Sequence, residues 1–252
     1  MKYKLLAVLL IMCFLAGCGY SNYMLSDDSS KIESIIVKIV STGEDENGNV
    51  LKKEAIGFRV KDGLVVGLTH ATTAPFQTCV MTPFGVMCRP VETTNRKYFI
   101  DDTELQPIGS HRDISLFAGL KPLNDYIPFG DSDKLVRGTK IATLGFSRAQ
   151  AFNFKTGVVS YPNINGEYDA MLGEKMAEEL NGMSMMIAMP VNPGDSGSPV
   201  IAFYNGNPQI VGIVCAVGLG SQGMNFAFHS NFVQEAIQKI TRGPCWYLGS
   251  ME

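Results

Sequence analysis

The sequence has little net charge and no long apolar run. Lys and Arg together number 21 against 24 Asp and Glu, so the formal net charge is −3. This mild acidity offers no basic footprint, and we therefore expect no nucleic-acid partner. The apolar run at residues 5–17 is too short to span a bilayer comfortably. Internal repeats and low-complexity segments are also missing.

The sequence also lacks the spacings of common metal and cofactor sites. Its six cysteines contain no CxxC pair of the zinc type. Four methionines at positions 183, 185, 186 and 189 are more typical of a packed core than of a copper site. Residues 111–113 spell the His-Arg-Asp of a kinase catalytic loop, but the strand lysine and Asp-Phe-Gly motifs of kinases are missing. We expect neither a metal nor an organic cofactor.

The N-terminus has the pattern of an export signal. Lys2 and Lys4 precede the apolar run, and small residues follow it. Leu-Ala-Gly-Cys at residues 15–18 resembles a bacterial lipobox, in which the cysteine becomes the acylated first residue. We predict a signal peptide at residues 1–17 and lipidation of Cys18; a plain signal peptide with a chance cysteine is the alternative. Several acyl chains on one cysteine would hold the protein firmly on a membrane.

The residues after Cys18 indicate which membrane would hold the protein and how the lipid would be joined to the folded domain. Gly19 favours the outer membrane, facing the periplasm, if the host is Gram-negative. Residues 18–31 have few core-forming positions, which predicts a flexible tether between lipid and domain, with the first strand from Ile32.

A small, turn-rich segment at residues 192–199, Asn-Pro-Gly-Asp-Ser-Gly-Ser-Pro, is the strongest candidate site. Apolar runs at residues 185–189 and 200–203 flank it and predict buried strands. Ser196 on such a turn can expose its hydroxyl and turn neighbouring amides outward. Nucleophilic acyl transfer needs both features, although an ordinary loop has the same composition.

The chain also supplies a histidine and an acid for such a serine. The apolar strand predicted at residues 64–69 leads into His70, and Asp113 leads the strand predicted at residues 113–117. Alone, His70 could be a core histidine and Asp113 a strand cap. The order His70, Asp113, Ser196 resembles the trypsin/chymotrypsin superfamily, and most closely the bacterial HtrA-type proteases.

Further segments carry this resemblance, which covers roughly residues 32–242. They are residues 55–58 (Ala-Ile-Gly-Phe), 130–135 (Gly-Asp-Ser-Asp-Lys-Leu), 141–145 (Ile-Ala-Thr-Leu-Gly) and 156–160 (Thr-Gly-Val-Val-Ser). The resemblance implies a mainly β fold of two six-stranded antiparallel β-barrels with a C-terminal helix. The first barrel would take residues 32–121, the linker 122–128, the second barrel and helix 129–243, and a tail 244–252. The PDZ domain of many relatives has no room before Glu252.

The resemblance also assigns roles. Ser196 would attack the peptide carbonyl, His70 would carry its proton, and Asp113 would orient His70. The oxyanion hole would lie at Gly194, Asp195 and Ser196, with the amides of Gly194 and Ser196 as donors. The substrate pocket would be formed by Pro190, Val191, Asn192, Pro193, Val214, Cys215, Ala216, Val217 and Ala227.

These roles predict a serine endopeptidase that acts on protein or peptide substrates. A tryptic pocket would need an aspartate at Pro190, and a glutamate-specific pocket a histidine on the strand at 214–216; neither is present. Cleavage after small or medium apolar residues is therefore expected. A non-enzymatic binding protein on the same scaffold is the alternative, and an acyl transferase is not separated from a protease by the sequence alone. The oligomeric state is open.

Two further expectations concern Asp195 and the cysteines. Digestive relatives bury a freed N-terminal amine beside the aspartate before the serine, but an acylated Cys18 cannot serve, so Asp195 must find another donor or lie exposed. Cys79 and Cys88 would face each other across a hairpin at residues 75–90 and could form a disulfide in an oxidising compartment. Pairing of Cys215 with Cys245 stays open.

Overall fold

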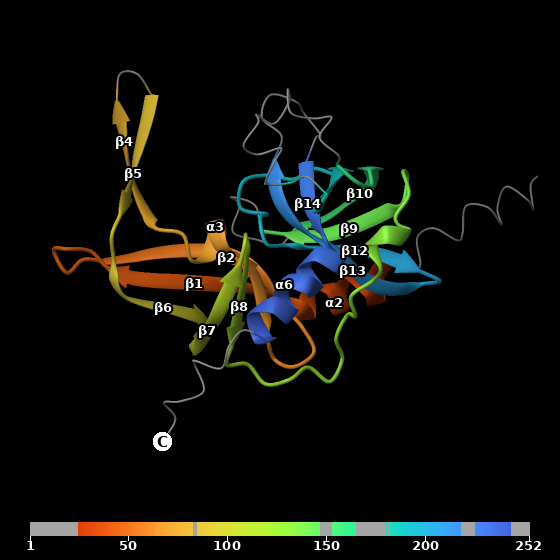
Figure 1. The fold of residues 1–252 in the computed structure, drawn as a ribbon, viewed down its shortest axis with the longest axis horizontal. Helices are drawn as coiled ribbons and strands as arrows, with labels where there is room; N and C mark the ends of the chain where they lie inside the picture. Colours follow the sequence, from red (N-terminus) through yellow and green to blue (C-terminus); the bar gives the residue numbers. More distant parts are fainter. Residues whose placement is uncertain are drawn as a thin grey trace, which may run out of the picture.

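Short apolar segments separated by polar turns fold into two closed β-barrels (Figure 1). The computed structural model describes residues 25–82, 85–146, 153–164, 180, 182–217 and 225–242. Each barrel has six antiparallel strands, and a helix follows the last strand. The predicted fold class is confirmed.

The first barrel has the strand order β1-β2-β3-β8-β7-β6, and pairing of β1 with β6 closes it. Turns at Asn47-Gly48 and Asp62-Gly63, dipeptides typical of β-hairpins, connect β1 to β2 and β2 to β3. The strands are β1 (Ile36–Glu44), β2 (Val50–Arg59), β3 (Val65–Leu68), β6 (Thr94–Ile100), β7 (Thr103–His111) and β8 (Ile114–Ala118). The short helix α3 (Thr69–Thr72) follows β3 directly.

The second barrel has the order β10-β11-β14-β13-β12-β9, closed by the pairing of β9 with β10. Its strands are β9 (Lys140–Gly145), β10 (Asn153–Tyr161), β11 (Ser184–Ala188), β12 (Pro199–Tyr204), β13 (Asn207–Val217) and β14 (Asn225–His229). Residues 121–128 contain no helix or strand and connect the barrels, followed by the turn η1 (Ser132–Lys134). The helix α6 (Ser230–Arg242) runs from β14 back to β7 and β8 of the first barrel.

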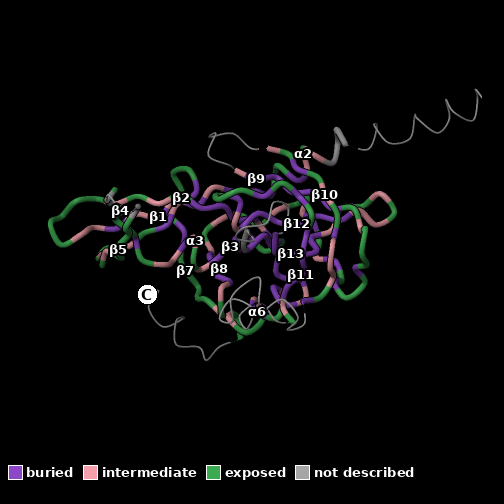
Figure 2. Tube along the Cα trace, turned by 90° about the horizontal axis from the view of Figure 1, so that it is seen from above, coloured by how far each residue is buried: buried purple, intermediate pink, exposed green. Residues whose placement is uncertain are grey.

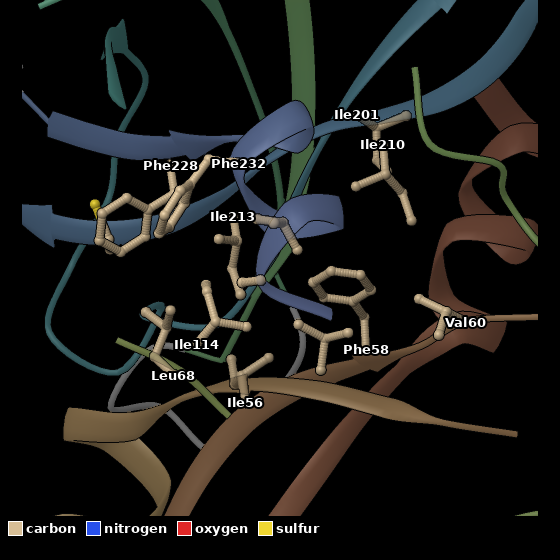
Figure 3. Packing of buried hydrophobic residues seen from close by; sticks show 14 of the residues in the cluster. Ile56, Phe58, Val60, Leu68, Ile114, Ile201, Ile210, Ile213, Phe228 and Phe232 are labelled. Carbon is tan, nitrogen blue, oxygen red and sulfur yellow. The ribbon is translucent and has the colours of Figure 1, made fainter. Parts of the chain in front are cut away.

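An apolar core joins the two barrels. Figure 3 shows Ile56 and Phe58 of β2 facing Ile213 of β13, with Phe232 of α6 nearby, all in one cluster. The Phe58 side chain has no exposed surface, and its ring meets Phe129 edge-on at 6.3 Å between centroids. Figure 2 shows that buried residues are concentrated on the strands of both barrels. This shared core fixes one barrel against the other, and with it any site between them.

The start of the domain differs from the sequence-based expectation. Helix α2 (Leu25–Ile35) occupies part of the predicted tether, and β1 begins at Ile36 rather than Ile32. Ile32 and Ile35 are fully buried in the shared core, and Lys31 pairs with Asp125 at 2.7 Å. The tether prediction was wrong for residues 25–31 because two isoleucines one helical turn apart are enough to dock an otherwise polar helix.

A hairpin of β4 (Phe76–Thr82) and β5 (Gly85–Val91) stands away from the first barrel (Figure 1). Its register places Cys79 directly opposite Cys88, and Cys88 is disulfide-bonded. Two of its methionines, Met81 and Met87, are 83% and 52% exposed. No helix among the described residues is long and apolar enough to cross a membrane. Cys18 and Cys245 lie outside the described residues.

Candidate active site

His70 and Asp113 meet where two strands of the first barrel end side by side. Leu68 at the end of β3 pairs with Ile114 at the start of β8, so the chain that leaves β3 toward His70 lies beside Asp113, which directly precedes β8. His70 Nδ1 lies 2.7 Å from Asp113 Oδ2, and the His70 amide donates to Asp113 Oδ1 at 2.9 Å. Because a carboxylate can only accept, the imidazole holds its proton on Nδ1. Nε2 is left as an acceptor on a side chain that is 49% exposed.

Polar residues buried under α3 hold His70 in place. The Thr72 hydroxyl bonds the Leu68 carbonyl at 2.7 Å and the Ser115 hydroxyl at 2.8 Å. Ser41 donates to the Thr72 carbonyl at 2.9 Å, and Lys53 Nζ donates to the His70 carbonyl at 2.9 Å. Burial lowers the pKa of Lys53. This support was not predicted from the sequence, although the hydroxyl of Ser115 within an apolar strand was a signal for it.

The segment before Ser196 is a type II β-turn. The Asp195 amide donates to the Asn192 carbonyl at 3.0 Å, Pro193 takes the second position, and Gly194 takes the third with φ +105°. A type II turn requires a positive φ at its third position, which glycine supplies without strain. The Asn-Pro-Gly-Asp sequence thus matches the turn that it forms.

This turn decides which amides can reach a ligand. No hydrogen bond among the described residues uses the amides of Gly194 or Ser196. The Asp195 amide, in contrast, is taken by Asn192 and cannot donate to an oxyanion. The two amides that stay available as candidate donors are those of Gly194 and Ser196, the pair expected as donors within the predicted oxyanion hole at residues 194–196.

The Ser196 turn lies against the first barrel. The Gly197 amide donates to the Val214 carbonyl of β13 at 2.9 Å, and a Cβ added at Gly197 would collide with the Ile56 carbonyl of β2. Since β2 pairs with β3, this contact puts the half-buried Ser196 near the end of the first barrel that carries His70. Among the described residues, no hydrogen bond joins the Ser196 hydroxyl to His70.

The predicted pocket residues come from two neighbouring strands of the second barrel and from the segment between β11 and β12. Val214 of β13 pairs with Ala227 of β14, and both are fully buried. Cys215 is also buried. Val191 is buried, whereas Pro190, Asn192 and Pro193 are exposed. The side chains of Ala216 and Val217 are outside the described residues.

A buried amide also lies beside the predicted pocket. Asn225 Nδ2 donates to the Met189 carbonyl at 2.6 Å, which fixes the segment that leads to the turn.

Within the described part of the chain, no group of three or more His, Cys, Asp or Glu could hold a metal ion.

Asp195 has a partner that the sequence did not reveal. Its carboxylate is fully buried and forms an ion pair with Lys155 Nζ of β10, itself only 7% exposed. The two residues are 40 positions apart, so only the folded barrel brings them together.

Solved structures share this architecture. The HtrA-type protease AlgW, solved with a tripeptide, superposes with a TM-score of 0.59 at 17% identity, covering 86% of this chain and 63% of AlgW. The chain therefore spans less than two thirds of that relative's length. The active form of the Rv3671c protease from M. tuberculosis gives a TM-score of 0.57 at 16% identity, covering 85% of this chain and 84% of that chain. At these identities the likeness shows the two-barrel fold alone.

Neither a protein-family model nor a curated protein matches the chain.

Proposed function

We propose that the protein is a serine endopeptidase with the triad His70, Asp113 and Ser196. The observation that carries the proposal is the His70–Asp113 contact, in which one carboxylate binds both the ring Nδ1 and the backbone amide of the histidine. A nucleophile turn with two unused amides lies against the adjoining strand of the same barrel. The trypsin-like fold of the protease neighbours supports the same chemistry.

Each residue has a defined step in the proposed reaction. Nε2 of His70 takes the proton from the Ser196 hydroxyl as its oxygen attacks the carbonyl carbon, and the tetrahedral oxyanion accepts hydrogen bonds from the amides of Gly194 and Ser196. The imidazolium then protonates the leaving amine, and water releases the acyl group by the same route in reverse. Asp113 stabilises the charged imidazole throughout. The oxyanion donors supply the largest electrostatic contribution, because they are already oriented before the reaction.

The test compares Ser196→Ala and His70→Ala with the parent on a mixed peptide library. Triad members act as a unit, so either variant should lower kcat by several orders of magnitude. Asn205→Ala, in the exposed turn between β12 and β13, is the matched control and should keep parental activity. Full hydrolysis by either triad variant would refute the proposal.

The pocket favours apolar side chains before the cleaved bond. Val214 and Ala227, two of the proposed pocket residues, are apolar and fully buried, and the described pocket residues include no charged side chain. A substrate charge buried there without a partner would cost several kcal/mol. Because one methylene is worth about 1–3 kcal/mol, the preference for Val, Ala or Leu should be graded. Library cleavage dominated by Arg, Lys, Asp or Glu would contradict this assignment.

We further propose that the protein is exported and anchored to a bacterial membrane through lipidated Cys18. The lipobox-like residues 15–18 motivate this, and α2 leaves residues 18–24 as the span between the lipid and the domain. Cys18→Ser should abolish metabolic labelling by palmitate and release the protein from membranes. Continued lipid labelling of that variant would place the anchor elsewhere.

A non-enzymatic binding protein on this scaffold is the alternative function. The retention of His70, Asp113 and Ser196 in one chain argues against it, because a binding protein has no need of the complete triad. Binding of peptides by both the parent and Ser196→Ala, with no cleavage by either, would favour it.

A further inference from the structure

Asp195 is a buried charge directly beside the proposed nucleophile. Its side chain has no exposed surface, and its Oδ2 atom faces the ammonium group of Lys155. A carboxylate in such a position must be paired or be expelled to water, since desolvating a lone ion is costly. The cation therefore decides whether Asp195 stays where it is.

The same carboxylate ties together the turn that presents the oxyanion donors. Oδ2 of Asp195 also accepts the Asn192 amide at 2.7 Å, and the Asp195 amide donates to the Asn192 carbonyl at 3.0 Å. The backbone amide and carbonyl of Asn192, the first residue of the turn, are thus both bound to Asp195, its last residue. If Asp195 moved toward solvent, both bonds would break and the peptide that carries the Gly194 amide could rotate away.

The position of Lys155 is built into the second barrel. Lys155 of β10 pairs across the sheet with Thr143 of β9, two residues from Gly145. A Cβ added at Gly145 would collide with Asp195 Oδ1 and lie 3.2 Å from Lys155 Nζ. The glycine thus provides the room in which the two charges meet.

We propose that Lys155 is the positioning residue that holds the oxyanion hole in its working form. Through Asp195 it keeps the type II turn, and hence the amides of Gly194 and Ser196, directed at the substrate. Because this cation belongs to the barrel itself, the site is competent without a newly cut N-terminus. This inference rests on the proposed protease function, and it assigns Lys155 no contact with the substrate.

The test removes the Lys155 ammonium group by substitution and then adds a small alkylammonium ion to the solution to replace it. Losing one oxyanion donor typically costs about 100- to 1,000-fold in kcat. Lys155→Ala should lower kcat by about that factor with KM little changed, because the substrate pocket is left intact. Propylammonium chloride should then restore part of the lost kcat in a saturable way, whereas potassium chloride should not. A merely structural lysine would give no such split between kcat and KM and no rescue.

Two controls make the result decisive. Lys140→Ala, an exposed lysine on the neighbouring strand β9, should keep parental kcat and ignore the amine. If Lys155→Ala does not fold, the neutral double variant Lys155→Met with Asp195→Asn removes both charges and avoids an unpaired buried ion. That variant should fold and still show the loss of kcat.

The outcomes separate this proposal from the protease assignment. Parental kcat in folded Lys155→Ala or in the double variant would overturn the role of Lys155. The same holds for a folded Lys155→Ala that loses kcat but gains nothing from the amine. Ser196→Ala is measured in parallel, and its full activity would overturn the protease assignment instead.

Discussion

Replacing Asp113 by asparagine tests the proposed triad through the proton position on His70. The His70 backbone amide can only donate, and it faces Oδ1 of Asp113 at 2.9 Å. In Asp113→Asn the amide oxygen must take that place, so the NH₂ group turns toward Nδ1, 2.7 Å away in the parent. Nδ1 then has to accept, which moves the imidazole proton to Nε2. The ring can no longer take a proton from Ser196.

The size of the effect follows from this change of tautomer. In a protease triad the equivalent substitution lowers kcat about 10⁴-fold, which is about 5.5 kcal/mol of transition-state stabilisation. The effect on folding should be small, about 1 kcal/mol or less, because His70 and Asp113 are 49% and 28% exposed and solvent screens the pair. Activity and stability should therefore separate clearly.

Steady-state peptide hydrolysis measures the loss of kcat, and ¹⁵N NMR of the histidine ring reports which nitrogen holds the proton. Asp102→Asn, at an exposed position in the β6–β7 turn, is the matched control and should leave both unchanged. A kcat for Asp113→Asn close to that of the parent, or an unchanged tautomer, would refute the reasoning.

Three further substitutions test the barrels and the support of the turn. Phe58→Ala empties a fully buried position between the barrels and should cost about 3–5 kcal/mol in urea unfolding; a loss below that of an exposed control would show that the shared core is misplaced. Burial lowers the pKa of His229 below its ordinary value of 6.5, and its Nδ1 has no partner among the described residues. Below pH 6.5 His229 therefore binds a proton in the unfolded chain but stays neutral in the folded protein. The free energy of unfolding should then fall as the pH drops from 6.5 toward the lowered pKa of the folded state. His229→Phe should flatten that decline, and an equally steep pH dependence in this variant would exclude His229 as its source. Gly145→Ala overpacks the space beside Asp195 and should cost about 1–3 kcal/mol together with part of kcat; parental stability and kcat would contradict the tight contact.

Local chemistry made the nucleophile turn predictable from sequence. Proline and glycine at the second and third positions of residues 192–195 favour a type II turn wherever the chain places them. The strand that leads into His70 and the strand after Asp113 were also local patterns, and their pairing followed from the fold that the motifs indicated. Such features can be predicted from the sequence because they do not depend on residues far away in the chain.

Features that depend on distant partners were not predictable. Lys155 lies next to the Thr-Gly-Val-Val-Ser segment of β10, but nothing in that segment indicates a buried cation, and only the β9–β10 register beside Gly145 brings it to Asp195. Helix α2 was not predicted because its helical period rests on Ile32 and Ile35, and their burial depends on core residues from other elements. The partner of a buried charge and the docking of a mostly polar helix therefore cannot be predicted from the sequence alone.

Covalent labelling of the purified protein by a fluorophosphonate probe, with mass spectrometry of the modified peptide, tests the central claim most directly. The account predicts one labelled residue, Ser196, and strongly reduced labelling in His70→Ala, because the hydroxyl reacts only when Nε2 of His70 takes its proton. A folded protein in which Ser196 is never labelled, or is labelled equally well without His70, would contradict the account.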